Sequence, residues 1–302
     1  MCHSMGGLIA RWFLQAGDPR DVRSIITIGT PHRGAATALQ RLLMGVGGKL
    51  GSRLGLPSIA RTLPSLHQLL PEYACIDDAG VLRKTPEVEL PDLDQRMIAD
   101  GARFHDELNE TPSAAMTTHA IVGIAQPTIT TFDARSDTLT ELFTIAGADE
   151  LGDGTVPRLS GRPKGGQERS EAHYVVGKHG ALPSSRTVLT QVQGIVTERW
   201  VEHRAADPAA MIGVEVEDLV AAGQPVAIQA MCADEHALLE ARVLNAALDP
   251  HTGPFTLAPT ADPKLRQGEV ETLRAGGYLV QVRRRGASNW TFDAVTTPVL
   301  AV

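Results

Sequence analysis

The sequence predicts an α/β domain over residues 1–206 and a smaller all-β domain over residues 207–302. Helix-like and strand-like patterns alternate along the first part, as in an α/β sheet. After residue 207, short alternating runs are separated by Gly, Pro and Asp, which is typical of a β-sandwich of immunoglobulin-like size. The pattern changes from alternating helix and strand signals to short strand signals at residues 204–208, and this change sets the predicted boundary.

The α/β part begins with a turn, a helix, a strand and a loop. Residues 5–16 predict a helix that Gly17-Asp18-Pro19 ends. The β-branched run at 22–28 predicts a buried strand, followed by a loop at 29–34. Residues 35–92 form a long excursion with amphipathic segments at 38–44 and 59–70, and we expect it to act as a cap or lid.

The regular pattern resumes after this excursion. We expect a helix over 92–109 with Asp92 as its N-cap, strands at 119–124 and 138–145, and a helix over 186–202. Residues 152–157 are rich in turn formers. In the all-β part, strands are expected at 214–217, 226–231, 241–244, 278–282 and 290–293.

Composition excludes several classes of protein. The net charge of −7 argues against a nucleic-acid-binding surface. No run approaches the roughly 20 apolar residues of a membrane helix, and no signal peptide is visible, so a cytoplasmic location is the default expectation. The three cysteines lie far apart, which predicts neither a disulfide framework nor a zinc site; Cys75 and Cys232 are expected to be buried.

The chemistry is predicted from the first residues. Ser4 has a small residue two positions before it, Cys2, and another two positions after it, Gly6. This approaches the nucleophile elbow, a sharp strand-to-helix turn that exposes a serine. The helix that follows would place the backbone N–H of Met5 near a developing oxyanion. Cysteine is less usual than glycine at the first flank.

Two later segments complete the set of groups that an activated serine needs. The Gly-Asp-Gly-Thr-Val-Pro loop at 152–157 supplies Asp153, and His179 follows 26 residues after it. The chain order Ser, Asp, His is that of α/β-hydrolases. The same three residue types form the nucleophile, the orienting acid and the base of serine hydrolases.

Together, five segments resemble the lecithin:cholesterol acyltransferase family, a branch of the α/β-hydrolase lipases. They are residues 3–13, 26–34, 63–73, 152–157 and 178–182, so the resemblance spans roughly residues 1–200. It implies that Ser4 is the nucleophile, His179 the general base and Asp153 the residue that orients it. It also implies acyl transfer from a lipid or small ester to water or an alcohol, possible transient contact with a lipid surface, and no metal or organic cofactor.

Other assignments stay open at this stage. His173 is an alternative base and Asp149 an alternative acid, while a nucleophilic Cys2 is a weaker idea. We expect His3 and His32 to be structural, His67 and His105 to lie on the surface, and Trp12 and Phe13 to lie in the core.

The sequence departs from the family at its start. Only three residues precede Ser4, so the strand that leads into the elbow is expected to be missing, together with the loop that carries a second oxyanion donor. We expect the natural reading frame to extend upstream. A non-catalytic binding or interaction protein derived from a shortened hydrolase is the alternative function, and no protein partner is predicted.

Overall fold

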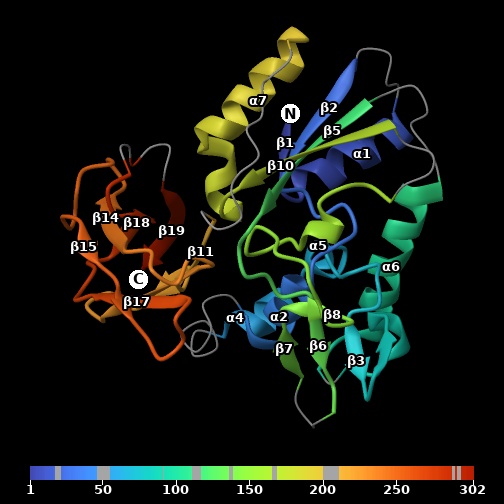
Figure 1. Cartoon of the computed structure of the whole chain (residues 1–302). Coiled ribbons are helices and arrows are strands. Elements are labelled where there is room, and N and C mark those ends of the chain that lie inside the picture. Colours follow the sequence, from blue (N-terminus) through green and yellow to red (C-terminus); the bar gives the residue numbers. More distant parts are fainter. Residues whose placement is uncertain are drawn as a thin grey trace. The chain divides into compact units, whose positions relative to one another are not determined.

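The computed structural model describes residues 1–17, 22–45, 55–90, 92–110, 117–135, 139–164, 169–199, 211–287, 290 and 294–302. The chain divides into two compact units (Figure 1). The first comprises residues 1–45, 55–124 and 128–175, and the second comprises 46–54, 125–127 and 176–302. Each unit is described by itself. The predicted boundary at 206/207 lies outside the described residues. The last and longest segment of the second unit starts earlier, at Val176.

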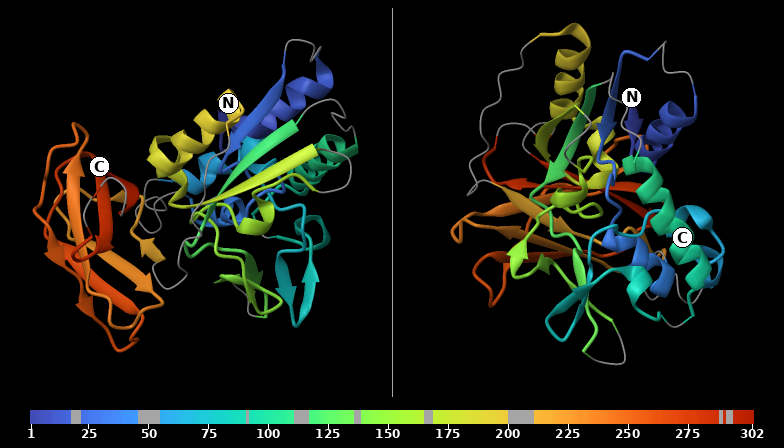
Figure 2. Two further views of the ribbon diagram at one scale, coloured as in Figure 1. Left: turned by 45° about the horizontal axis from the view of Figure 1, so that its top comes forward. Right: turned by 90° about the vertical axis from the view of Figure 1, so that its right-hand side faces the viewer.

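The first unit is built around a sheet in the order β1-β2-β5-β10. Its strands are β1 (Cys2–His3), β2 (Ser24–Ile28), β5 (Thr117–Ile124) and β10 (Arg169–Val176). The left view of Figure 2 shows β2, β5 and β10 side by side. The pairs β1–β2 and β2–β5 are parallel. The expectation that no strand precedes Ser4 is therefore wrong, because Cys2 pairs with Thr27 and His3 with Ile28.

Five α-helices accompany this sheet among the described residues of the first unit. They are α1 (Gly6–Ala16), α2 (Ala36–Met44), α4 (Leu56–Ala60), α5 (Pro64–His67) and α6 (Gln95–Glu110), with 3₁₀ turns η2 (Thr85–Glu87) and η3 (Arg158–Ser160). The prediction that Asp92 caps α6 is wrong. Asp92 has a φ of +63°, and Asp94 is the residue whose carboxylate accepts a hydrogen bond, at 2.8 Å, from the N–H of Arg96.

The excursion at 35–92 and residues that follow it in the chain form one hydrophobic core. A small sheet in the order β4-β3-β6-β7 contains β3 (Ile76–Asp78), β4 (Val81–Arg83), β6 (Thr131–Asp133) and β7 (Thr140–Leu142), and β8 (Thr144–Ile145) pairs with β9 (Ala148–Asp149). Leu39, Leu42, Ile76 and Phe132 are completely buried in one cluster. The excursion is thus packed against β6, which the sequence pattern did not predict.

The second unit contains two sheets that share one hydrophobic core. One has the order β11-β13-β17-β16 and the other β12-β19-β18-β14-β15. The strands are β11 (Ile212–Glu215), β12 (Leu219–Val220), β13 (Val226–Cys232), β14 (Leu239–Asn245), β15 (Phe255–Thr256), β16 (Ala258–Pro259), β17 (Leu265–Val270), β18 (Gly276–Arg284) and β19 (Val295–Ala301). Buried and exposed residues alternate along β13, as the sequence pattern predicted. The predicted strand at 290–293 falls largely outside the described residues.

The second unit also includes segments that precede the two sheets. They are the 3₁₀ turn η4 (His179–Ser184), helix α7 (Arg186–Thr197) and residues 125–127. The fully buried side chain of Gln126 donates to the carbonyl of Ile212 and accepts from the N–H of Val214, both at 2.9 Å. A Cβ on Gly180 would lie 2.9 Å from Pro298, so η4 packs closely on β19.

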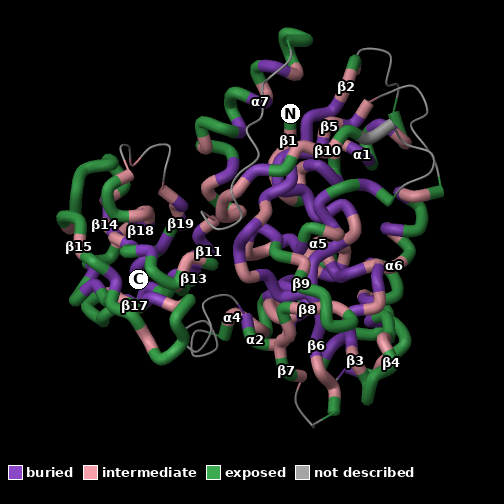
Figure 3. Tube along the Cα trace, viewed as in Figure 1, coloured by how far each residue is buried: buried purple, intermediate pink, exposed green. Residues whose placement is uncertain are grey.

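Figure 3 colours the backbone trace of both units by burial. The exposed fractions of single residues correct two predictions. His67 and His105 are each only 1% exposed, so the expectation that they lie on the surface is wrong. Trp12 and Phe13 are 40% and 59% exposed, so they do not belong to the core. Cys75 is buried as predicted, and burial raises the pKa of its thiol to about 12. Within the described residues, no helix combines the length and apolar character that crossing a membrane requires.

Candidate functional site

Ser4 lies at the turn between the end of β1 and the start of α1. Its φ is +53°, in the left-handed region that residues with a side chain seldom occupy. The N–H of Ser4 donates to the carbonyl of Ile28 at 3.0 Å, which extends the β1–β2 ladder. Its own carbonyl accepts a hydrogen bond from the Thr30 hydroxyl at 2.9 Å. These two bonds hold the backbone on both sides of a strained torsion, and such strain is commonest at active sites.

Helix α1 starts directly after this serine, with Met5 at its N-cap. No side chain caps the helix, and its first turn has no acidic residue. The first N–H groups of a helix have no partner inside the helix, and they carry the positive end of its dipole. The N–H of Met5 lies at this helix start, and its role as an oxyanion donor stays a prediction.

Two glycines follow Met5, and the structure distinguishes their roles. A Cβ on Gly6 would lie 3.8 Å from the Cβ of Cys2, an ordinary contact, so the cysteine at the first flank is accommodated. A Cβ on Gly7 would lie 2.3 Å from the Thr30 hydroxyl oxygen. Gly7 is thus the glycine that the close approach requires, although the elbow pattern indicated Gly6.

The loop at 152–157, called the acid loop below, surrounds the buried carboxylate of Asp153. Asp153 is 1% exposed, and its Oδ1 accepts hydrogen bonds from the N–H groups of Thr155 at 3.0 Å and Val156 at 2.7 Å. Gly152 has no room for a Cβ, which would lie 1.9 Å from the carbonyl oxygen of Val156, and Gly154 has a φ of +90°. The glycines at these two positions let the chain fold tightly around the carboxylate.

Two threonines that the sequence analysis missed hold this loop. The Thr128 hydroxyl accepts hydrogen bonds from the N–H groups of Gly152 at 3.1 Å and Gly154 at 2.8 Å. The Thr37 hydroxyl donates to the carbonyl of Thr155 at 2.8 Å. No local motif indicates these contacts, because they join positions 24 to 118 residues apart.

The topology brings these segments to one edge of the sheet. Ser4 follows β1, Thr30 follows β2, and Thr128 follows β5 by four residues. The three strands are parallel, so their carboxyl ends meet at the same edge, where α/β proteins place their ligands. The structure thus brings Ser4 and the loop of Asp153 into one unit. His179 begins η4 in the second unit, and its role as the base stays a prediction.

The alternative site residues occupy other positions. Asp149 is exposed on β9, and its carboxylate accepts from the N–H of Leu151 at 2.9 Å. His173 lies within strand β10 (Arg169–Val176), whereas Ser4 and Thr30 lie in turns that follow their strands. Both positions disfavour these residues as partners of Ser4.

His173 belongs to a small group of side chains on the neighbouring strands β5 and β10. Its imidazole, that of His119 and the carboxylate of Glu171 offer ligand atoms within 4.8 Å of one another. The Nδ1 of His119 lies 3.1 Å from a carboxylate oxygen of Glu171. Two imidazoles and one carboxylate are ligands that zinc or iron accepts. Of the residues that the structure describes, these three form the group with metal-ligand spacing.

His32 belongs to the same loop as Thr30. It is fully buried, and its Nε2 lies 3.0 Å from the Thr27 hydroxyl. Burial, and then the charge of Arg11, lower the pKa of His32 well below the ordinary value. The imidazole is therefore neutral at physiological pH, which agrees with the structural role predicted for it.

An apolar groove of about 550 Å³ begins beside the elbow. Met5, next to the serine, lines the groove together with three side chains of helix α1, of which Trp12 lies farthest along the helix. Ring stacking joins Trp12 to Phe104 of α6, with their centroids 5.4 Å apart. The remaining residues that line the groove come from α1, α5, α6 and the residues next to them: Leu8, Ile9, Pro64, Ser65, Gln68, Leu69, Asp100, Arg103 and Glu107.

Comparisons with known proteins match different parts of the chain. A family model described as a PGAP1-like alpha/beta domain matches residues 1–54. Among solved structures, that of the Tle4–Tli4 complex is similar over 65% of this chain and 58% of that chain, at 16% identity and a TM-score of 0.44. This chain thus spans less than two thirds of that protein.

Two other solved structures resemble smaller parts of the chain. A superoxide reductase (neelaredoxin) from Ignicoccus hospitalis covers 30% of this chain and 80% of its own, at 12% identity and a TM-score of 0.22. The sulfur carrier protein SoxY from Chlorobium limicola f thiosulfatophilum covers 39% and 99%, at 12% identity and a TM-score of 0.21. No curated protein matches the sequence. The family-model match covers the segment that contains Ser4, α1 and β2, and it points to the α/β-hydrolase superfamily.

Proposed function

We propose that this chain is a serine ester hydrolase of the lipase or esterase type. The observation that carries the proposal is the left-handed Ser4 between a parallel strand and a helix start that no side chain caps. A serine at such a turn projects its hydroxyl away from the sheet while the helix N–H groups surround the space beside it. The family match over the same residues supports the superfamily.

In the proposed mechanism, His179 takes the proton of the Ser4 hydroxyl as its oxygen attacks the ester carbonyl. Asp153 orients the imidazole and stabilises its charged form, and the Met5 N–H stabilises the oxyanion. Collapse of the tetrahedral intermediate expels the alcohol, which takes the proton from His179, and leaves an acyl-serine. Water, activated by His179, then releases the acid and restores the serine.

Lipid-like esters fit this proposal because the apolar groove starts at the residue after the nucleophile. Met5 and Trp12 line it, so an acyl chain on Ser4 would lie along α1 and remove apolar surface from water. The resemblance of the sequence to the lecithin:cholesterol acyltransferase family supports transfer to an alcohol as a second outcome of the same acyl-serine. Which acceptor is used depends on how well the site excludes water.

Labelling with a fluorophosphonate tests the proposal directly, because this reagent reacts with activated serines. We expect one modified residue, Ser4, identified by mass spectrometry, and complete loss of labelling in Ser4→Ala. Ser58→Ala is the matched control, since Ser58 is exposed on α4 and does not line the groove, so its loss should leave labelling unchanged. Absence of labelling in the folded chain would reject the catalytic proposal and favour a binding protein.

A further inference from the structure

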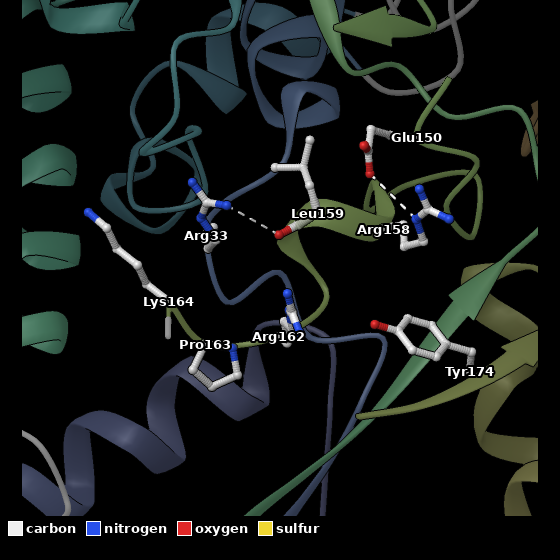
Figure 4. A pocket seen from close by; sticks show the side chains of 8 residues that line it. All are labelled: Arg33, Glu150, Arg158, Leu159, Arg162, Pro163, Lys164 and Tyr174. Atoms are coloured by element: carbon white, nitrogen blue, oxygen red, sulfur yellow. Dashed lines mark hydrogen bonds and ion pairs between the residues drawn. The ribbon is translucent and has the colours of Figure 1, made fainter. Parts of the chain in front are cut away.

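A second cavity of the first unit is lined mainly by positive charge. It has a volume of about 450 Å³, and Figure 4 shows the side chains around it. Four cations and one carboxylate face this space, in a chain whose net charge is −7. The lining residues are Arg33, Glu150, Arg158, Leu159, Arg162, Pro163, Lys164 and Tyr174. Such a concentration of cations around a cavity attracts anions.

Two of the four cations already have acidic partners. The guanidinium of Arg158 lies 3.6 Å from Glu150, and that of Arg33 lies 2.7 Å from Glu72. Arg162 and Lys164 are exposed and form no ion pair with any residue that the structure describes. The cavity therefore keeps at least two uncompensated positive charges.

The backbone that carries these two cations is held in place. A Cβ on Gly161 would lie 2.4 Å from the side chain of Val122 on β5, so the chain passes close to the sheet just before Arg162. Pro163, between the two cations, is buried. Figure 4 shows the ammonium of Lys164 directed away from Arg162, so a ligand that both contact requires the Lys164 side chain to rotate. A backbone that is already held in place lowers the entropic cost of this binding.

The donors around the cavity match a phosphate group. Figure 4 shows the Tyr174 hydroxyl directed toward Arg162. A guanidinium donates two parallel hydrogen bonds to a phosphate, an ammonium adds a point charge, and a phenol donates one more bond. We propose that this cavity binds a dianionic phosphate monoester group, or free phosphate itself, through Arg162, Lys164 and Tyr174.

The cavity adjoins the proposed catalytic site along the chain. Glu150 and Arg158 flank the acid loop at 152–157, and Arg33 belongs to the loop after β2 that also carries Thr30. An ester substrate with a phosphate monoester group would be anchored here while its carbonyl approaches Ser4. This role in substrate recognition rests on the proposed function, whereas phosphate binding itself does not.

Isothermal titration of the Ser4→Ala chain with inorganic phosphate at low ionic strength tests the cavity without any catalysis. In the Ser4→Ala background, the double variant Arg162→Ala/Lys164→Ala should weaken binding at least about tenfold, because each removed group donates charged hydrogen bonds. The matched control is Lys264→Ala/Arg274→Ala, which removes the same two charges from exposed positions of the second unit. It should leave the affinity unchanged.

Two further probes distinguish the sources of phosphate. Glycerol 1-phosphate presents the monoester in a small molecule, and phosphatidylcholine vesicles with added phosphatidic acid present it at a lipid surface. The proposal stands if the chain binds at least one phosphate probe and the Arg162/Lys164 variant, unlike the control, loses that binding. It is overturned if no probe binds, or if both double variants behave alike. Because the fluorophosphonate experiment uses a different readout, either proposal can fail while the other survives.

Discussion

The two units of this chain differ in the titratable side chains that they bury, although both bury some polar groups, such as Gln126 and Arg266 in the second unit. The first unit buries polar groups near its parallel sheet, among them Arg11, Asp153 and the histidines at 32, 67 and 105. The described part of the second unit buries no histidine, and its shared core is formed by aliphatic residues together with Tyr278 and Cys232. Burying a polar group costs free energy unless it is hydrogen-bonded, and burying a charge costs more unless it is paired, so such groups constrain the chain around them.

The buried side chains of the two units have different structural effects. In the second unit, completely buried Ile228 and Val243 contribute to a core that stabilises two sheets. In the first unit, hydroxyls such as those of Thr30 and Thr128 fix the backbone of Ser4 and of the acid loop. The hydrogen bonds of the first unit therefore hold the backbone around Ser4 and Asp153, whereas Ile228 and Val243 stabilise the second unit by burial.

The largest effect is expected when the buried Asp153 side chain loses its charge but keeps its shape. Asp153→Asn keeps an oxygen that can accept the two backbone hydrogen bonds at Oδ1, but it no longer stabilises a charged imidazole. In a serine protease triad the corresponding change lowers kcat by about 10⁴-fold. We expect a loss of similar size in ester hydrolysis, measured by steady-state kinetics.

The control for this prediction is Asp149→Asn. Asp149 is exposed and four residues earlier in the chain, so its replacement should leave the rate unchanged. An equal loss of rate in both variants would show that the loss does not depend on the charge of Asp153 in particular. Circular dichroism of each variant checks that the fold is retained.

The two interiors also differ in how far the sequence predicts them. The alternation along β13 and the elbow around Ser4 are local patterns, so the sequence alone predicts the sandwich strand, helix α1 and the candidate nucleophile. Strand β1 was missed because two residues carry no periodicity, and its pairing with β2 supplies the stability. Thr30 and Thr128 were missed because their partners lie more than 20 residues away in the sequence.

A smaller effect is expected from filling space at the elbow. In Gly7→Ala the added methyl group would meet the buried side chain of Thr30, and such overpacking costs about 1–3 kcal/mol of the free energy of unfolding. Gly6→Ala, whose methyl group would lie 3.8 Å from Cys2, should change stability by less than about 0.5 kcal/mol. Urea denaturation of both variants measures the difference.

Thr30→Ala provides a check on the cause of this destabilisation. Combined with Gly7→Ala, it removes both atoms that the new methyl group would approach most closely, so the double variant should be more stable than the sum of the two single changes predicts. Strictly additive losses would show that Gly7 is required for another reason.

The last effect concerns pH. Burial lowers the pKa of His32 in the folded state, whereas in the unfolded chain it is about 6.5. Below that pH the unfolded chain binds a proton that the folded chain does not, so stability falls as the pH decreases, by up to about 1.4 kcal/mol per pH unit from this residue. Burial also lowers the pKa of His105, which adds to the same trend.

Hydrogen exchange between pH 7.5 and 5 should therefore show the first unit losing protection before the second. His32→Gln should reduce the pH dependence, while His236→Gln, at an exposed position of the second unit, should not. Equal loss of protection in both units would contradict the comparison, because it would mean that the buried histidines do not make the polar interior more sensitive to acid.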